Sequence, residues 1–220
     1  MSLLRGIVEI VDSLMAALAI GFLIIFSPLL NRWYRSWGAT SDEVKDRMLG
    51  DEFVPETRLV STRAITVRAP AAEVWPWLAQ VGQGRGGWYS YEKLENLVGC
   101  QIQNADRILS EFQRPEVGEK IRLAPSGGPY FVVEEIDHGK AMVLGARNPK
   151  TDQPDDFSWT FAVREMGSST SRLIVRSRNY YQRSLPNSLI WRVITDPVQF
   201  VMERKMLKTI KKRAEAATSS

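Results

Sequence analysis

The most apolar part of the chain lies near its N-terminus. Residues 13–31 carry no charged side chain and include the unbroken apolar run Leu14–Phe26. A helix over this segment rises about 28 Å, close to the roughly 30 Å thickness of the hydrocarbon core of a bilayer. Aromatic side chains within residues 33–37 follow, where amphipathic rings favour the membrane interface. The pattern predicts a transmembrane helix over about residues 13–31, within an N-terminal anchor formed by residues 1–36.

Two other interpretations of the apolar segment stay open. A cleaved signal peptide is disfavoured because Glu9 and Asp12 precede the apolar run and bulky residues follow it. A buried core helix is disfavoured because a small domain could hardly cover an apolar helix on every side. Basic residues are more numerous after the segment than before it, with Arg5 before it and Arg32, Arg35, Lys45 and Arg47 after it. This asymmetry predicts a single-pass protein of the cell membrane whose C-terminal domain is cytoplasmic.

The pattern changes twice in the next part of the chain. Residues 37–60 show little hydrophobic periodicity, and Thr40–Glu43 fits a helix cap and first turn, so this segment is predicted to be a linker with one short helix. Beyond Ser61, β-branched residues alternate through Thr62–Val67 and predict a first strand. Apolar side chains then recur at helical spacing from Val74 to Val81, which predicts a helix with one apolar face.

Short alternating segments follow and are separated by turn residues. They predict five strands, at Lys120–Leu123, Tyr130–Ile136, Ala141–Ala146, Phe157–Val163 and Ser171–Asn179. Ala105–Phe112 is predicted to form a further short helix. Asp196 and Pro197 fit the N-cap and the first position of a long amphipathic helix that runs to about Ala216. Consecutive strands with tight turns imply an antiparallel sheet, so residues 61–220 are predicted to form one α+β domain.

Composition is that of a folded domain in a reducing compartment. The chain has 220 residues, of which 44% are hydrophobic and 25% are charged, as in ordinary folded proteins. Cys100 is the only cysteine, so no disulfide can form within the chain. The formal net charge of +4 suits an anionic neighbour such as a phospholipid surface. No basic stripe alternates with aromatic residues, so nucleic acid is not an expected partner.

Few residues could carry catalytic or metal chemistry. His138, the single histidine, lies in an Asp-His-Gly turn, and neither a nucleophilic triad nor a zinc site finds enough partners. The glycines of Gly82–Gly87 follow a predicted helix rather than a strand, so we expect a structural turn rather than a phosphate loop. An acid/base pair could come from four carboxylates, but no spacing singles one out: Glu92, Glu95, Asp106 and Glu203. No catalytic residue, metal or cofactor is therefore predicted.

The order of the predicted elements and several motifs resemble a known superfamily. A strand, the segment Ala69–Leu78 with the sequence APAAEVWPWL, antiparallel strands and a long last helix follow in the order of the helix-grip fold. Together with Arg85–Tyr91 and Phe200–Met206, they resemble a membrane-anchored bacterial member of the START-like, Bet v 1-like superfamily, also called the SRPBCC or polyketide cyclase/lipid-transport group. The resemblance covers roughly residues 38–215. It implies a curved antiparallel sheet around the C-terminal helix, with a cavity between them that accepts an apolar ligand.

The residues expected to face this interior are mostly aromatic. The predicted ligand-binding residues are Trp77, Trp88, Tyr89, Tyr91, Trp159, Phe161, Met202, Glu203 and Met206. The two tyrosine hydroxyls, Glu203 or Arg204 could orient a polar head group. A stripe of aromatic and methionine side chains is also typical of a plain packed core, and that interpretation stays open.

Three functions are compatible with these patterns. The first is a membrane-tethered domain that binds a lipid-like or other hydrophobic small molecule, loaded from the adjacent bilayer. The second is an enzyme of the cyclase, dehydratase or hydrolase type that uses a pocket tyrosine or a carboxylate as acid or base. The third is a non-catalytic interaction module of a membrane complex. Because the fold that the resemblance implies serves many activities, the choice depends on the site itself.

Overall fold

The computed structural model describes residues 2–125 and 128–218 of the chain. The predicted anchor and domain also include residues 1, 126–127 and 219–220, which lie outside this part. At the centre is a six-stranded antiparallel sheet with the strand order β1-β6-β5-β4-β3-β2. The strands are β1 (Leu59–Val67), β2 (Lys120–Arg122), β3 (Tyr130–Asp137), β4 (Ala141–Arg147), β5 (Pro154–Glu165) and β6 (Ser171–Asn179).

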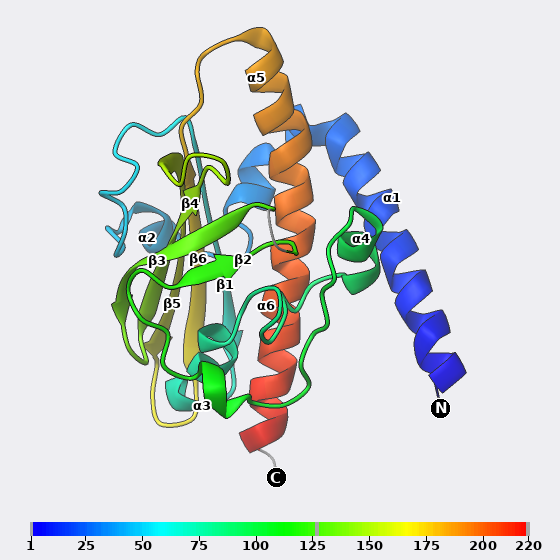
Figure 1. Cartoon of the computed structure of the whole chain (residues 1–220), viewed down its shortest axis with the longest axis vertical. Coiled ribbons are helices and arrows are strands. Elements are labelled where there is room, and N and C mark those ends of the chain that lie inside the picture. The colour runs from blue at the N-terminus through cyan, green and yellow to red at the C-terminus, as the bar shows by residue number, and fades with distance from the viewer. Residues whose placement is uncertain (1, 126–127, 219–220) are drawn as a thin grey trace.

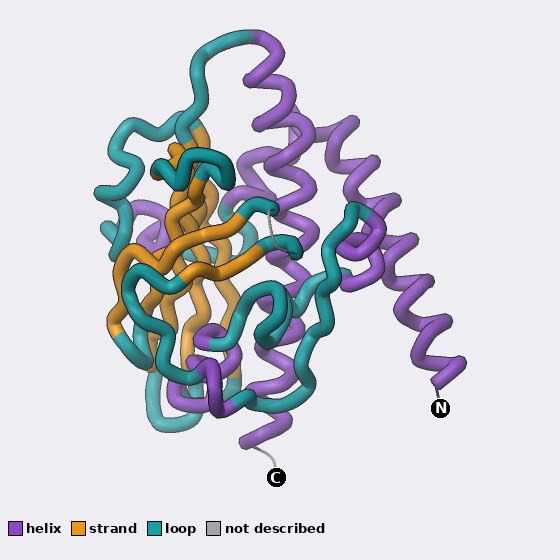
Figure 2. Tube along the Cα trace, in the orientation of Figure 1, coloured by secondary structure: helices purple, strands orange, loops and turns teal. Residues whose placement is uncertain are grey.

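Two long helices lie on one side of the sheet. α6 (Asp196–Thr218) packs against the sheet, and α1 (Ser2–Arg35) runs antiparallel to α6 on the side away from it (Figure 1). The shorter helices are α2 (Ser41–Lys45), α3 (Ala71–Ala79), α4 (Glu92–Leu97) and α5 (Leu185–Leu189), with a 3-10 turn at Ser110–Phe112 and a π-helical segment at Ile190–Thr195. Figure 2 shows that the strands lie along one side of α6. This is the predicted helix-grip fold, which is confirmed.

The two faces of the sheet carry different side chains because successive residues of a strand point to opposite sides. On β5, Phe157, Trp159 and Phe161 join the hydrophobic core between the sheet and α6, as their alternation predicts. Thr160 points to the opposite face, where its Oγ1 donates to the carbonyl oxygen of Leu49 at 3.0 Å. The interior of the domain is therefore the face that meets α6.

The opposite face of the sheet is covered by the segment that was predicted to be a linker. It contains α2, the short helix expected there, and it packs on the sheet through Arg176 of β6. The Arg176 guanidinium donates to the carbonyl oxygens of Glu43 at 2.7 Å and Asp46 at 2.8 Å, and it pairs with the Asp51 carboxylate at 2.8 Å. This part of residues 37–60 thus packs against the sheet, and the predicted start of the domain at residue 61 stays a prediction.

The start of α6 differs from the prediction. Asp196 is not an N-cap, because its backbone is helical (φ −63°, ψ −45°) and the π-helical segment before it continues directly into α6. The cap lies earlier, where the Ser184 hydroxyl accepts from the Asn187 N–H at 3.2 Å. Pro197 has no N–H to donate to the carbonyl oxygen one turn earlier. A π-helical segment can accommodate such a missing hydrogen bond. The Asp196 carboxylate is therefore free to form ion pairs.

The predicted short helix over Ala105–Phe112 is also wrong in extent. Only its last residues, Ser110–Phe112, form a helical turn, and that turn is of the 3-10 type. The preceding residues follow an irregular path held by the Gln80 side chain, which donates to the carbonyl oxygen of Arg107 at 3.1 Å and accepts from the Leu109 N–H at 2.8 Å. Polar side chains that bind the backbone in this way compete with helix formation.

Candidate functional site

Aromatic rings form a continuous cluster between the sheet and α6. The rings of Trp88 and Trp159 stack with centroids 5.4 Å apart, and Phe161 adjoins Trp159 at 4.8 Å. Phe131 of β3 meets both indoles, at 6.1 Å from Trp88 and 5.8 Å from Trp159. We call these four residues the aromatic cluster. It lies where the resemblance places an apolar ligand.

Two hydrogen-bond donors of the aromatic cluster have no acceptor among the residues that the structure describes. The indole Nε1 atoms of Trp88 and Trp159 are buried, and within the described residues neither finds a partner. An indole N–H can only donate, and a buried donor without an acceptor costs about 1–3 kcal/mol. Two such groups on stacked rings are suited to a bound molecule that is apolar in most of its surface and carries an oxygen acceptor.

A tight glycine turn places Trp88 in this cluster. Gly82 and Gly87 exchange two backbone hydrogen bonds, of 3.0 and 3.1 Å. Gly87 has a φ of +77°, and a Cβ there would lie 2.5 Å from the amide oxygen of Asn104, so only glycine fits. The same Asn104 oxygen accepts from the N–H of Tyr89, whose φ is +56°. The expected structural turn is thus present, and it turns adjacent rings toward different parts of the core.

Tyr89 is held on the far side of that turn. Its ring meets Trp77 edge-on at 5.9 Å, and the Arg213 guanidinium lies 4.8 Å from its centre. The hydroxyl accepts from the Gln80 side-chain nitrogen at 2.8 Å. Burial raises the pKa of Tyr89 to about 12, partly offset by this hydrogen bond and by nearby arginines. The hydroxyl therefore stays protonated at neutral pH.

The predicted ligand-binding residues fall into several groups. Trp88, Trp159 and Phe161 belong to the aromatic cluster, and Trp77 and Tyr89 form the neighbouring pair. Trp159 is partly buried and the other four are buried, whereas the role of all five in ligand binding stays a prediction.

The other predicted residues lie on or near α6. Met206 is buried in the core between α6 and the sheet. Tyr91 packs instead against the cluster that joins α1 to α6. The backbone oxygen of Met202 accepts from the Ser90 hydroxyl at 3.2 Å. Tyr91 therefore lies beside α1 and α6, and Met202 contacts Ser90, rather than either joining the aromatic cluster.

Glu203 lies in a buried ion network. One of its oxygens meets the Arg63 guanidinium at 2.5 Å, and the other accepts from Gln199 at 2.8 Å. Arg63 also pairs with Asp196 at 3.2 Å and donates to the backbone oxygen of Tyr34 at 2.8 Å. Arg63 and both carboxylates are almost fully buried. The network joins β1, the end of α1 and α6, and both Glu203 oxygens are used within it.

Sequence reasoning missed Arg63, although a signal was present. Arg63, Ile65 and Val67 alternate along β1 and share one face of the strand. Val67 and Ile65 pack in the core between the sheet and α6. An arginine in register with core residues is costly unless it is paired, so the pattern requires a buried carboxylate partner elsewhere in the chain.

The side of α1 that faces the domain is its more polar side. Asp12 pairs with Lys205 of α6 at 2.5 Å, and Glu9 lies 3.6 Å from Lys93. Further along, the Ser27 hydroxyl donates to the carbonyl oxygen of Arg192 at 2.9 Å. Apolar residues such as Ala16 and Leu23 fill the spaces between these contacts. α1 is therefore docked on the domain along much of its length.

The outward side of α1 is apolar. Its exposed large apolar residues are Ile7, Val8, Ile10, Val11, Leu14, Met15, Leu18, Phe22, Ile25, Phe26, Leu29 and Trp33. We call this set the outward face of α1. A surface helix of a soluble domain normally turns its polar side to solvent, and large exposed apolar patches mark interaction sites. By its length, and by the mean hydropathy of 2.3 over its most apolar 18 residues, the helix is also able to cross a membrane.

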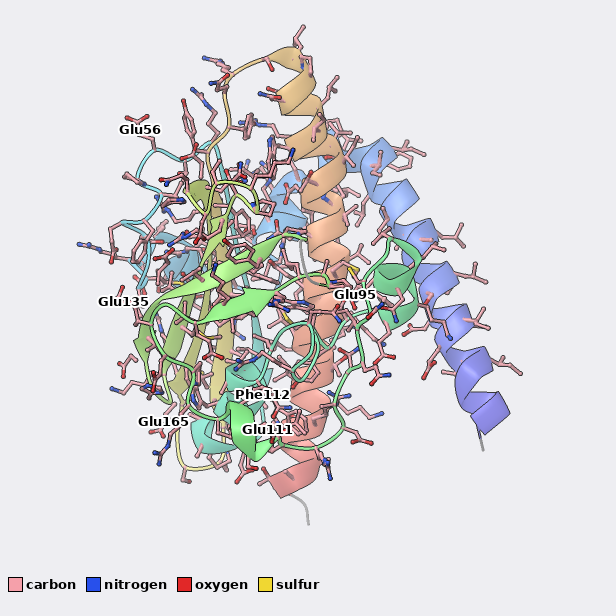
Figure 3. The ribbon with its side chains drawn as sticks, in the orientation of Figure 1. Glu56, Glu95, Glu111, Phe112, Glu135 and Glu165 are labelled. Carbon is pink, nitrogen blue, oxygen red and sulfur yellow. The ribbon has the colours of Figure 1, made fainter. Side chains whose placement is uncertain are left out.

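Among the carboxylates considered as acids or bases, Glu95 on α4 has a displaced pKa (Figure 3). Burial, and to a lesser extent repulsion by Glu92, raises the pKa of Glu95 to about 7. The folded state thus favours the protonated form. The contribution of Glu95 to stability is complete below its unfolded-state pKa near 4.5 and is lost as the pH rises through its folded-state pKa of about 7.

We therefore expect Glu95→Gln to stabilise the protein in a pH-dependent way. Because glutamine mimics the protonated acid, the two proteins should be about equally stable at pH 4.5, and the variant should gain roughly 1–3 kcal/mol at pH 8. Urea unfolding across this range measures the difference. Glu111→Gln, at an exposed site, is the matched control. A gain for Glu95→Gln that does not grow with pH would contradict the assignment.

Comparisons with known proteins find similar structures only. No family model matches the chain, and no curated protein matches it. The di-domain ARO/CYC BexL of the BE-7585A biosynthetic pathway has 18% identity and a TM-score of 0.47 over 74% of this chain and 48% of its own, so the chain spans about half of that protein. A Polyketide_cyc-like protein of Corynebacterium glutamicum has 11% identity and a TM-score of 0.42, over 74% of this chain and 93% of its own. The Zhui aromatase/cyclase of a Streptomyces species has 12% identity and a TM-score of 0.38, over 73% of this chain and 95% of its own.

Proposed function

We propose that this chain is a membrane-attached domain that binds a lipid-like or other hydrophobic small molecule between the sheet and α6. The observation that carries the proposal is the aromatic cluster with two buried indole donors that lack an acceptor. Its rings supply an apolar surface, and each of its two N–H groups offers a hydrogen bond to an oxygen of the ligand. The cluster contains no titratable side chain, which favours binding over the cyclase, dehydratase or hydrolase alternative.

Membrane attachment is supported by the outward face of α1. In a membrane-spanning arrangement α1 would leave α6 and lose contacts such as Asp12 with Lys205 and Ser27 with Arg192. The outward face can enter a lipid surface with these contacts intact, as amphipathic helices do when they lie in the interface. We therefore propose that α1 stays docked while its outward face contacts lipid. The cytoplasmic placement of the domain rests on the charges that flank a spanning segment and stays a prediction. The spanning helix stays a prediction.

The interior site is tested by the molecules that the protein retains. The full chain is purified in detergent, and its bound organic molecules are extracted and identified by mass spectrometry. We expect one apolar, oxygen-containing molecule in near-stoichiometric amount. The Trp88→Phe/Trp159→Phe variant removes both indole donors and keeps aromatic rings in place. At about 1 kcal/mol for each hydrogen bond, it should retain roughly thirtyfold less ligand.

A matched variant separates interior binding from lipid held by α1. Trp33→Phe changes an exposed ring of the outward face and should leave the interior ligand unchanged. Equal ligand content in all three proteins, or no ligand in any of them, would overturn the proposed interior site. Capture of a stoichiometric protein through the outward face, with no lipid binding, would instead favour the interaction-module alternative.

A further inference from the structure

A groove of about 630 Å³ opens between α1 and α6, apart from the aromatic cluster. The two helices diverge toward the N- and C-terminal ends of the chain (Figure 1), and residues of both line the groove. One wall comes from α1 through Glu9 and Asp12, and the floor comes from the segment 89–93 with Asn104. The opposite wall is the basic side of α6.

The acidic groups of this groove are already engaged. Glu9 lies 3.6 Å from Lys93, and Asp12 pairs with Lys205 at 2.5 Å. The third carboxylate, that of Glu92, accepts from a backbone N–H. The six basic residues of the lining outnumber its three carboxylates, so the groove keeps a net positive charge.

Three cations of α6 remain, at intervals of four residues. Arg204, Lys208 and Lys212 line the groove, and in the described part of the chain none of them pairs with a carboxylate. Residues four apart lie above one another on a helix, so the three form a ladder. Partial burial and repulsion by Arg204 and Lys205 lower the pKa of Lys208. An anion in the groove would relieve this repulsion.

The groove adjoins the outward face of α1. Val8 and Val11, both exposed, belong to that face and are sequence neighbours of the groove residues Glu9 and Asp12. An amphiphile with an anionic head could place its head against the cation ladder and its chains along the apolar side of α1. Electrostatic attraction and apolar burial would then act on the two ends of one molecule.

We propose that this groove binds the phosphate group of an anionic phospholipid. Arg204, Lys208 and Lys212 hold the phosphate, and the acyl chains continue along the outward face of α1. The proposal rests on the proposed attachment of α1 to lipid, and it adds a head-group site that is separate from the aromatic cluster. A free phosphate ion carries the same anionic group as the lipid head, so both are compared in the test.

The test is a titration of the full chain in neutral dodecyl maltoside micelles. The probes are dioctanoyl phosphatidylglycerol, dioctanoyl phosphatidylcholine and inorganic phosphate. The readout is the change in total tryptophan fluorescence, to which Trp37 contributes because its ring lies 5.4 Å from the Arg204 guanidinium. We expect the anionic lipid to bind at least about tenfold more tightly than the zwitterionic one, with the preference reduced by salt. The Arg204→Gln/Lys208→Gln/Lys212→Gln variant should abolish the preference.

The control carries the same change of charge elsewhere. Arg47→Gln/Lys140→Gln/Lys150→Gln alters three exposed cations outside the groove and should keep the preference. A preference that survives in the ladder variant, or that is absent in the wild type, overturns the proposal. Inorganic phosphate that binds as tightly as phosphatidylglycerol overturns the lipid assignment and leaves a site for a free anion.

This titration is independent of vesicle binding. A wild-type chain that prefers phosphatidylglycerol in micelles but does not bind vesicles would overturn the proposed membrane attachment and retain the groove. A chain that binds neutral vesicles and shows no preference in micelles would retain the proposed membrane attachment and overturn the groove.

Discussion

Arg63→Met is expected to lower the free energy of unfolding by about 3–5 kcal/mol, the usual cost of removing one partner from a buried ion pair. The change leaves Glu203 without its cation and Asp196 with Arg35 alone, and both carboxylates are 1% exposed. It also frees the backbone oxygen of Tyr34 at the end of α1. Urea unfolding of the full chain in detergent micelles, followed by tryptophan fluorescence, measures the loss.

Two further variants define the cause of this loss. Arg164→Met removes a partly exposed arginine of β5 that lies 3.7 Å from Asp46, and it should cost less than about 1 kcal/mol. Arg63→Met/Glu203→Leu removes both charges of the pair and should recover part of the stability, since an apolar replacement of a buried pair is often tolerated. A loss in Arg63→Met no larger than in Arg164→Met would show that the network contributes little.

Leu18→Lys/Phe22→Lys is expected to remove most of the lipid binding of α1. Both residues are exposed on the outward face, at 69% and 54%, so the lysines need not disturb the contacts with α6. Two charges at lipid depth should cost at least about 2 kcal/mol, or roughly thirtyfold in partitioning. Flotation of the full chain, synthesised in the presence of neutral phosphatidylcholine vesicles, measures the bound fraction.

The control for this variant keeps the surface apolar. Leu18→Met/Phe22→Leu should float like the wild type. Flotation of the lysine variant at the wild-type level would contradict a lipid-facing role for this side of α1.

A crosslink distinguishes a docked α1 from a spanning one. In a Cys100→Ser background, Asp12→Cys and Lys205→Cys place thiols at positions that form an ion pair in the structure. A short bismaleimide should join them in vesicles if α1 stays on α6. A chain that floats with vesicles and does not crosslink would favour the spanning helix.

The sheet could be predicted well from the sequence because its signal is local. All six strands lie where alternating segments predict them, and Ser171–Asn179 has the predicted bounds. On β5 the alternation that places Phe161 inward holds along the strand. A period of two residues reports which face is buried without any knowledge of what covers it.

Features that depend on distant polar partners could not be predicted in this way. Asp196 matches a helix cap locally, but Arg63 and Arg35 compete for its carboxylate from far away in the sequence. The segment before β1 has no hydrophobic period, yet Arg176 binds it through backbone oxygens that every residue carries. Sequence patterns of side chains do not report such contacts.

The sequence predicted most of the residues in the candidate site, but not how their side chains are arranged. The ring-bearing residues Trp88, Trp159 and Phe161 were identified because large aromatic side chains are usually buried. The stacking of two indoles and the lack of an acceptor depend on the glycine turn and on the pairing of β5, neither of which a linear pattern resolves. The cation ladder was not predicted, because nothing in the sequence places α1 beside that side of α6.

The ion network around Arg63 also sets an order of events during synthesis. Arg63 and α1 emerge from the ribosome early, whereas both carboxylates that neutralise Arg63 belong to α6, more than 130 residues later. Until then β1 lacks its strand partner β6 as well, so the domain cannot close. Contacts so distant along the chain form slowly. An α1 that reaches lipid while the chain is still growing therefore brings the final closure of the domain to the membrane surface.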